Sequence, residues 1–378
     1  MSSEQQAFLC VADITGYTGY LNASELEHAR GTLTDLLGVL VDHAGPPMRI
    51  SKLEGDAVFS YAFENAFTDG RTFLDLIEAT YVAFRRAIDS MVLNNTCQCN
   101  ACANVSSLDL KFVIHFGSFV VQKVGTYDEL LGPAVNLVHR LLKNTVVERL
   151  GISAYCLYTE PASQRLGFEA VTGLVPHDED VADFGVVRTY VQDLADVYHS
   201  DDEEEITLDP SNVWFTMEAD LPMPPAVVWD YMASPLYRNI LIGSTRQEVK
   251  DLVGGRVGVG SAYQCYHGDR LTPQRIVEWK PFTKIVTKDG FSDSWMGIMT
   301  VIYTLRETPN GTQLSSDLGG LKDRPPWVRA TLRTMAPIFR RKQTRALADF
   351  VDTVTSDFEN RHTSFGNGGS ELPDPQTV

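Results

Sequence analysis

Apolar and polar positions in the first part of the chain follow two different periods, which predicts a mixture of strands and helices. The apolar run 7–14 has the length of a buried strand. Apolar residues at helical spacing over 26–40 predict a helix, with Ser24 and Glu27 three residues apart as its capping box. The strand patterns 48–53 and 57–62 flank Glu54-Gly55-Asp56, a sequence typical of a tight hairpin.

The pattern continues with a helix over 72–92 and two more strands, 108–116 and 118–124, on either side of Gly117. Gly132-Pro133 then begins another helix, with proline in its first turn. The order β-α-β-β-α-β predicts a ferredoxin-like α+β core with additions.

The second part of the chain has a different order of elements. A strand over 213–219 precedes a helix opened by Pro224-Pro225, and an amphipathic stretch over 327–361 closes the region. Between them we expect antiparallel strands that wrap around the last helix. Their ranges are 261–266, 274–279, 284–288, 299–306 and 312–318.

A block of like charge separates the two regions. Five consecutive acidic residues occupy 201–205, and such a run resists burial and is typical of a linker or solvated loop. We therefore expect the following division: an N-terminal domain over 1–195, an acidic linker over 196–211, a C-terminal domain over 212–361 and a disordered tail over 362–378, which is rich in Gly, Ser and Pro.

Composition narrows the classes of protein further. The net charge of −17 disfavours binding to nucleic acid, because the chain as a whole repels phosphate backbones. The six cysteines are too few and too clustered for a disulfide framework, so a reducing, cytoplasmic location fits best. The first residues lack a basic region and no apolar run reaches ~20 residues, which predicts neither a signal peptide nor a transmembrane segment.

Two aspartates are the first candidates for chemistry. Asp13 ends the first predicted strand and Asp56 lies in the hairpin, so neighbouring strands would bring both to one edge of the sheet. Two close carboxylates repel unless a cation lies between them, which suits Mg²⁺ or Mn²⁺ and a polyphosphate. The turn after Asp13 carries Ile14, Gly16 and Thr18, whose backbone N–H groups can hold phosphates. Either aspartate alone is better explained as a turn residue.

The segment Gly132-Pro133-Ala134-Val135-Asn136-Leu137-Val138-His139-Arg140 carries the next candidates. Asn136 and Arg140 are four residues apart, so they share one face of a helix. An arginine suits the charge that develops during phosphoryl transfer, and an asparagine can orient a sugar oxygen. When this segment is considered alone, an exposed polar face explains it better.

Taken together, these motifs resemble the catalytic domain of class III nucleotidyl cyclases, the adenylate and guanylate cyclase homology domain. The resemblance covers about residues 6–195. It rests on the order and spacing of four motifs: Asp13-Ile14-x-Gly16-Tyr17-Thr18, Lys52-x-x-Gly55-Asp56-Ala57-Val58, Ile114-His115-x-Gly117 and Gly132-Pro133-Ala134-Val135-Asn136-x-x-x-Arg140.

The resemblance implies roles for the matching residues. Asp13 and Asp56 correspond to the aspartates that bind two divalent metal ions, Mg²⁺ or Mn²⁺. Lys52 corresponds to the purine-contacting lysine of adenylate cyclases, which selects ATP rather than GTP. Glu129 stands where those enzymes usually carry Asp or Thr as the second purine contact. A carboxylate can accept a hydrogen bond from the adenine amino group, but the longer side chain leaves base selectivity open.

The resemblance also implies that Asn136 orients the ribose and that Arg140 stabilises the transition state. In this family the metal residues and the transition-state residues of one site come from different protomers, which implies a homodimer. The function expected is the conversion of ATP to cyclic AMP and pyrophosphate. Two alternatives stay open: a signalling protein that binds nucleotide or lipid without catalysis, and a scaffold with a zinc-stabilised dimer.

Cys97, Cys99 and Cys102 lie in a polar stretch between a predicted helix and strand. Three thiols this close in a reducing compartment favour a soft metal such as Zn²⁺, although no fourth ligand is evident from the sequence. Unligated surface thiols explain the cluster equally well.

The C-terminal region resembles, in its order of elements, the START-like, polyketide cyclase/dehydrase (SRPBCC) type of helix-grip domain. The resemblance implies an apolar cavity that binds a hydrophobic small molecule or lipid and could regulate the cyclase. We expect aromatic residues to line the cavity: Trp229, Tyr231, Tyr263, Trp279, Trp295 and Tyr303.

Overall fold

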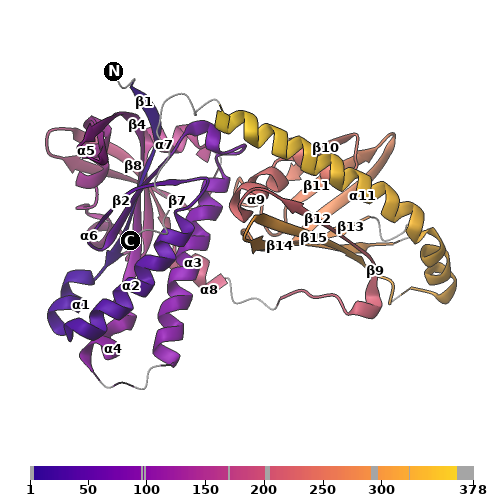
Figure 1. The fold of residues 1–378 in the computed structure, drawn as a ribbon, viewed down its shortest axis with the longest axis horizontal. Coiled ribbons are helices and arrows are strands. Elements are labelled where there is room, and N and C mark those ends of the chain that lie inside the picture. The colour runs from indigo at the N-terminus through magenta and orange to yellow at the C-terminus, as the bar shows by residue number, and fades with distance from the viewer. Residues whose placement is uncertain are drawn as a thin grey trace.

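The computed structural model describes residues 4–94, 97, 99–168, 171–200, 205–290, 297–322 and 324–363. It has a mixed α+β architecture with two sheets that follow one another along the chain. Figure 1 shows the N-terminal half and the C-terminal half side by side, with the closing helix along one side of the second sheet.

The N-terminal sheet has eight strands in the order β2-β3-β1-β4-β6-β8-β7, and β5 pairs with β4. The first strand lies in the centre, antiparallel to both β3 and β4. The β-α-β-β-α-β order predicted from the sequence is therefore present with additional elements. The strands are β1 (Gln5–Thr15), β2 (Arg49–Glu54), β3 (Ala57–Ala62), β4 (Asp109–Val124), β5 (Tyr127–Leu131), β6 (Tyr155–Thr159), β7 (Leu174–Val181) and β8 (Gly185–Asp193).

Helices cover both faces of this sheet, and two separate apolar cores result. One core packs α2 and α3 against one face, and the other packs α5 against the opposite face. The helices of this half are α1 (Tyr17–Ala23), α2 (Leu26–His43), α3 (Thr72–Leu93), α4 (Asn100–Asn104), α5 (Pro133–Arg140), α6 (Val146–Leu150), α7 (Glu160–Arg165) and α8 (Ala195–Ser200), with 3₁₀ turns η1 (Glu64–Ala66) and η2 (Val105–Ser107).

Two local predictions are wrong. The segments expected as a strand pair around Gly117 form one continuous strand, β4, because its first part pairs with β1 and β6 and its last part with β5. Ser24 does not cap α2: it ends α1, and the N-cap of α2 is Glu25.

The C-terminal half is a seven-stranded antiparallel sheet in the order β10-β11-β12-β13-β14-β15-β9, with α11 packed along it. The strand β10 is short and polar, and the sequence pattern does not predict it. The elements are η4 (Pro210–Asn212), β9 (Val213–Leu221), α9 (Pro225–Ala233), α10 (Pro235–Leu241), β10 (Arg246–Asp251), β11 (Ala262–His267), β12 (Arg270–Lys280), β13 (Lys284–Asp289), β14 (Met299–Thr308), β15 (Gly311–Gly319) and α11 (Pro326–Thr363).

The two ends of the predicted acidic linker, 196–211, overlap helical elements, α8 at its start and η4 at its end. Residues 201–204 lie outside the described residues. Glu205 is exposed, as expected of a linker residue, but it also pairs with the buried Lys284, with Nζ at 2.9 Å. The neighbouring Ile206 N–H donates to Glu278 at 2.9 Å. Of the predicted tail, residues 364–378 lie outside the described residues.

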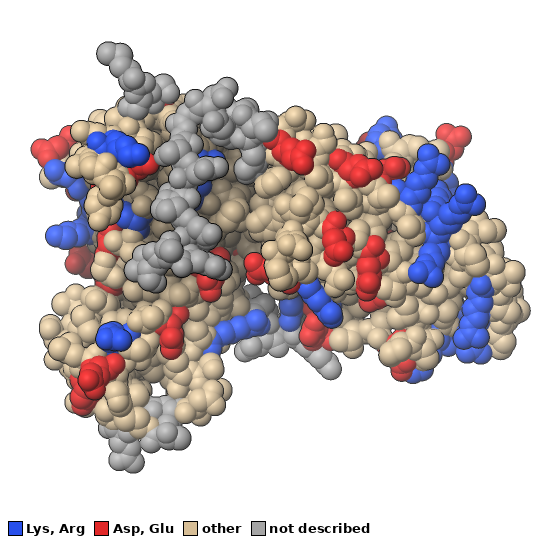
Figure 2. Space-filling view, viewed as in Figure 1, with Lys and Arg blue, Asp and Glu red and all other residues tan. Residues whose placement is uncertain are grey.

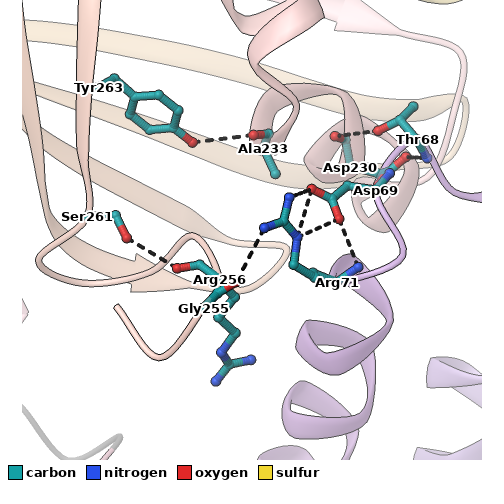
Figure 3. Close-up of polar contacts among 9 residues, drawn as sticks. All are labelled: Thr68, Asp69, Arg71, Asp230, Ala233, Gly255, Arg256, Ser261 and Tyr263. Carbon is teal, nitrogen blue, oxygen red and sulfur yellow. Dashed lines mark hydrogen bonds and ion pairs between the residues drawn. The ribbon is translucent and has the colours of Figure 1, made fainter. Parts of the chain in front are cut away.

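Polar contacts hold the two halves together at the start of α3 (Figure 3). The buried carboxylate of Asp230 on α9 accepts the backbone N–H groups of Thr68 at 2.5 Å and Asp69 at 3.3 Å. Arg71 binds Asp69 and also donates to the carbonyl of Gly255 at 3.3 Å. Burial raises the pKa of Asp230 to about 6, against the lowering effect of these backbone donors.

A second group of buried charges lies deeper in the same junction. Arg256 Nη2 donates to both carboxylate oxygens of Glu78, at 2.7 and 2.8 Å. Asp75, only 5% exposed, accepts the indole N–H groups of Trp229 at 3.0 Å and Trp279 at 3.3 Å. Residues from α3, α9 and β12 therefore share one polar network across the junction.

The surface of the C-terminal half carries a concentration of positive charge on an otherwise acidic protein (Figure 2). Exposed basic side chains follow α11, among them Arg333, Arg340, Arg341, Lys342 and Arg345. None of the described helices combines the length and the apolar character that spanning a membrane requires.

Candidate functional site

The two aspartates predicted to bind metal lie at one edge of the N-terminal sheet. Asp13, near the end of β1, is paired in register with Ala57, which directly follows Asp56. The backbone N–H of Ile14 donates to the carbonyl of Asp56 at 3.2 Å, which fixes the hairpin against β1. On the other side of Asp13, Lys111 of β4 places its ammonium 3.0 Å from the Asp13 carboxylate.

The surroundings at this edge of the sheet disfavour the ionised form of Asp56. Burial raises the pKa of the Asp56 carboxyl, the nearby charge of Asp13 raises it further, and Lys111 opposes the shift. A cation bound between the two carboxylates would relieve that repulsion, and carboxylate oxygens are the ligands that Mg²⁺ and Mn²⁺ prefer. The donor set at this edge therefore fits a divalent metal ion.

Lys52 and Glu129, the predicted purine contacts, form an ion pair across β2 and β5. The distance from Lys52 Nζ to Glu129 Oε2 is 3.2 Å, and a second carboxylate, Glu54, lies 3.1 Å from the same ammonium. Burial disfavours the charge of Lys52, but hydrogen bonds to the two glutamates raise its pKa. The other oxygen of Glu54 lies 3.2 Å from His139 Nδ1. Lys52 is thus held between two acidic side chains rather than one.

Asn136 and Arg140 lie on the exposed face of α5, as their spacing predicts, while the opposite face is buried. Arg140 does not extend freely into solvent: its Nη1 donates to the carbonyl of Ala182 at 2.8 Å and pairs with Asp183 at 2.8 Å. Both partners belong to the turn between β7 and β8.

Two glycines of the motifs allow α5 to approach the sheet closely. A Cβ at Gly117 would lie 2.5 Å from the Cβ of Ala134, and one at Gly132 would lie 2.8 Å from the carbonyl oxygen of Ser118. Real Cβ contacts are not this short, so both positions require glycine. These residues position the helix that carries Asn136 and Arg140.

The turn after Asp13 has the form predicted from its composition. Gly16 has φ of +87°, a left-handed conformation that favours glycine, and α1 begins at the next residue. Ile14 is buried in the core, while Thr18 is exposed on α1. The turn directly follows the candidate metal ligand Asp13.

The site contains residues that sequence analysis missed. Lys111 and Glu54 contact predicted site residues directly, but neither stands in a motif that singles it out. Alternation along β4 and β2 places them toward those neighbours, a signal that becomes usable only when strand register is known. Asp183 is distant in sequence from Arg140, and no sequence pattern connects the two.

The two histidines near the site have structural environments. His115 is buried in β4 and its Nδ1 lies 2.9 Å from Thr159 Oγ1. Burial lowers its pKa to about 4, so the ring is neutral near neutral pH. His139 on α5 packs edge-on against Phe59, with ring centroids 4.8 Å apart.

The three clustered cysteines come together with a histidine that sequence analysis did not include. His28, near the start of α2, places Nδ1 3.0 Å from Cys99 Sγ and 3.6 Å from Cys97 Sγ. One ligand atom from each of His28, Cys97, Cys99 and Cys102 lies within 4.8 Å of the others. The remaining cysteines, Cys10, Cys156 and Cys265, are buried.

The C-terminal half encloses a cavity of about 280 Å³ between its sheet and α11. Of the aromatics predicted to line it, only Tyr303 does so among the described residues; Trp295 lies outside them. Trp229 and Trp279 instead bind Asp75 at the junction. The walls include the apolar side chains of Trp214, Phe215, Met217, Leu318 and Phe339.

Polar groups also face this cavity. Asp289 is partly buried, and its Oδ2 accepts a hydrogen bond from Gln274 at 2.5 Å. Its other oxygen, Oδ1, has no hydrogen-bond partner among the described residues. Burial raises the pKa of this carboxyl to about 6, partly offset by the hydrogen bond from Gln274 and the nearby charge of Arg238. Basic side chains, Arg270 and Lys342, also contribute to the lining.

Comparison with known proteins gives one family match and one close sequence relative. The family described as "Protein of unknown function (DUF2652)" matches residues 33–149, a range that includes Lys52, Asp56, Glu129 and Arg140 but not Asp13. An uncharacterized protein of Mycobacterium tuberculosis H37Rv, Rv2561/Rv2562, is 32% identical over 166 residues. The aligned part is 43% of this chain and 74% of that protein.

Solved cyclase structures resemble about half of the chain. The guanylyl cyclase Cya2 is 13% identical, with a TM-score of 0.39 over 50% of this chain and 92% of its own. The adenylyl cyclase CyaB from P. aeruginosa is 16% identical, with a TM-score of 0.37 over 51% of this chain and 96% of its own. Since both TM-scores are below 0.5, we base no functional assignment on these likenesses.

Proposed function

We propose that this chain, which belongs to the family of the mycobacterial protein Rv2561/Rv2562, is a nucleotidyl cyclase that converts ATP to cyclic AMP and pyrophosphate. The observation that carries the proposal is the placement of Asp13 beside the Asp56 hairpin at one edge of the sheet. Lys52 and Glu129 are joined on the adjacent hairpins, and α5 presents Asn136 and Arg140 on its exposed face.

Asp13 and Asp56 would hold the divalent metal ions. Bound there, Mg²⁺ or Mn²⁺ would stabilise the charge on the attacking and leaving oxygens. The chain's own residues would do the rest: Lys52 and Glu129 contact the purine, Asn136 orients the ribose, and Arg140 offsets the charge that grows on the α-phosphate. The ribose 3′-oxygen forms a bond to the α-phosphorus as the bond to pyrophosphate breaks, so no protein nucleophile is required.

The proposed active form is a homodimer in which Asn136 and Arg140 serve the partner's site. Both side chains are exposed on one face of α5. Large apolar side chains are also exposed beside the candidate purine contacts: Leu53 is 56% exposed and Tyr127 is 74% exposed. A second copy of the chain would cover them, which supports dimerisation through this face.

The test is an assay of purified protein with ATP or GTP in the presence of Mg²⁺ or Mn²⁺. We expect cyclic AMP from the wild type and none from Asp56→Ala, because the remaining carboxylate alone holds metal poorly. Asp42→Ala, an exposed position on α2, is the matched control and should keep wild-type activity. A folded dimer that makes no cyclic nucleotide from either substrate would contradict the proposal.

One observation favours a binding protein without catalysis as the second candidate. Arg140 is already engaged by Asp183 and by the carbonyl of Ala182, and these contacts must break before it reaches a nucleotide. The pair is exposed, so breaking it costs about 1 kcal/mol or less. Nucleotide binding without product, in both wild type and Asp183→Ala, would support this candidate over the cyclase.

We further propose that the C-terminal half is a START-like domain that regulates the cyclase by binding a mostly apolar molecule with a hydrogen-bond donor. The apolar walls of the 280 Å³ cavity support the first property. The second is supported by Asp289 Oδ1, which has no hydrogen-bond partner within the part of the chain that the structure describes. The test is a fluorescence titration with long-chain alcohols and fatty acids. We expect Asp289→Leu to lower the affinity for the alcohols about tenfold, because one hydrogen bond to the ligand is lost. Equal affinity for wild type and variant would exclude this role of Asp289.

A further inference from the structure

The cluster of His28, Cys97, Cys99 and Cys102 has the ligand set and the spacing of a closed metal site. All four ligand atoms lie within 4.8 Å of one another, although His28 is separated from the cysteines by about 70 residues of sequence. A tetrahedral zinc ion, with Zn–S of ~2.3 Å and Zn–N of ~2.0 Å, keeps its ligand atoms roughly 3.5–3.8 Å apart. The 3.6 Å between His28 Nδ1 and Cys97 Sγ falls in that range, whereas the 3.0 Å between His28 Nδ1 and Cys99 Sγ is shorter, so these two atoms must separate by about half an ångström when the ion binds.

The backbone around the cluster supports metal-bound thiolates. Cys99 is the N-cap of α4, and its sulfur accepts the backbone N–H of Cys102 at 3.4 Å. Glu25, the N-cap of α2, accepts the N–H of Ala101 at 3.2 Å, which fixes the start of α2 against α4. The elements that supply the ligands are therefore held together by contacts outside the ligand set, as is usual for the residues that orient metal ligands.

We propose that His28 Nδ1 and the thiolates of Cys97, Cys99 and Cys102 bind one structural Zn²⁺ ion. Three thiolates and one imidazole complete a tetrahedron, so the site has no open position for a substrate and its role is structural. Thiolate and imidazole ligands together select zinc over the Mg²⁺ or Mn²⁺ expected at the carboxylate edge.

The zinc ion would stabilise the part of the fold behind the nucleotide site. Figure 1 places α1, α4 and the start of α2 together at the foot of the N-terminal half. The segment after α4 supports the turn that follows Asp13: a Cβ at Gly16 would lie 3.1 Å from the carbonyl oxygen of Ser107. Loss of the ion should therefore loosen α1 and α4 first, which hydrogen exchange in peptides from these helices would detect.

The test uses full-length protein purified under reducing conditions without a metal-affinity tag. We expect one zinc ion per chain by elemental analysis, and intense visible absorption of a tetrahedral thiolate complex after replacement by Co²⁺. His28→Ala and Cys99→Ser should lower zinc affinity by at least about 100-fold in competition with a chelating dye. His43→Ala, also on α2, and Cys265→Ser, a buried thiol, are the matched controls and should retain the ion.

Three results would overturn the proposal: wild-type protein that neither contains nor takes up zinc, iron together with acid-labile sulfide, or zinc retained with wild-type affinity in both ligand variants. If a ligand variant fails to fold, the zinc content and the Co²⁺ spectrum of the wild type still decide. No ligand is shared with the proposed nucleotide site, so the zinc proposal does not depend on cyclase activity.

Discussion

The charged side chains of the N-terminal site are held in pairs that connect different elements. Lys111 joins β4 to Asp13 on β1, and Lys52 joins β2 to Glu129 on β5. Each pair reduces the repulsion that a cluster of carboxylates would otherwise create. The side chains of Lys52 and Glu129 are 39% exposed and that of Glu54 is 30% exposed, so solvent screens the attraction between them. These ion pairs therefore contribute to positioning groups for a nucleotide rather than to the stability of the fold.

His115 gives a prediction at the same scale, because its pKa is lowered to about 4 by burial. An unfolded histidine has a pKa near 6.5, so acid protonates the unfolded chain first, and stability is lost as the pH falls from about 6.5 towards 4. The decrease in the free energy of unfolding caused by this one histidine should be ~3 kcal/mol.

Urea unfolding of wild type and His115→Asn over this range would measure it. The asparagine keeps a partner for Thr159 but does not titrate, so the variant should be less stable near pH 7 and should lose less stability in acid. Parallel stability curves for the two proteins would show that His115 does not take up a proton on unfolding.

At the scale of elements, hydrophobic periodicity was sufficient for the longer helices and for most strands, but it missed β5 to β8, β10 and the short helices such as α4, α6 and α10. The central strand β1 and the β2–β3 hairpin were predictable because their side chains alternate or form a short buried run. The prediction was wrong at β4, because Gly117 was interpreted as a turn residue between two strands. In the structure, that glycine lies within a continuous strand because α5 packs too closely for a side chain.

Only those residues of the candidate site that belong to a sequence motif were predictable. The order of Asp13, Lys52, Asp56, Asn136 and Arg140 along the chain indicated the class of site. The partners Lys111, Glu54 and His28 were not predictable, because each is brought in by strand register or by helix packing. The predicted aromatic lining of the C-terminal cavity was wrong for the same reason, since composition does not tell which face of a helix or sheet Trp229 and Trp279 occupy.

For the whole molecule, the junction between the halves is the feature through which one half can affect the other. Its central contact is Arg256, which binds Glu78 on α3 through both carboxylate oxygens and lies 3.7 Å from Asp75. Both acids are buried, at 7% and 5% exposure. A ligand that moves the loop of Arg256 must therefore also move α3, which packs on the sheet that carries the candidate active site.

Arg256→Met tests this coupling, because it removes the cation and leaves two buried carboxylates without a countercharge. We expect a loss of ~3–5 kcal/mol and a change in calorimetry from one cooperative unfolding transition to two, one for each half. Arg275→Met, an exposed arginine on β12, is the control and should unfold as the wild type does.

The stability that Arg256→Met loses should depend on pH. Burial raises the pKa of Asp75 to about 7, although the charge of Arg256 lowers it. A carboxyl with a raised pKa favours folding when protonated, and that stability is lost as the pH rises through the folded pKa. Without the guanidinium the pKa rises further, so the variant should be destabilised more at roughly pH 8 than at roughly pH 5. A single, pH-independent transition in the variant would mean that the junction does not couple the halves, and the C-terminal cavity would then need another route to the cyclase site.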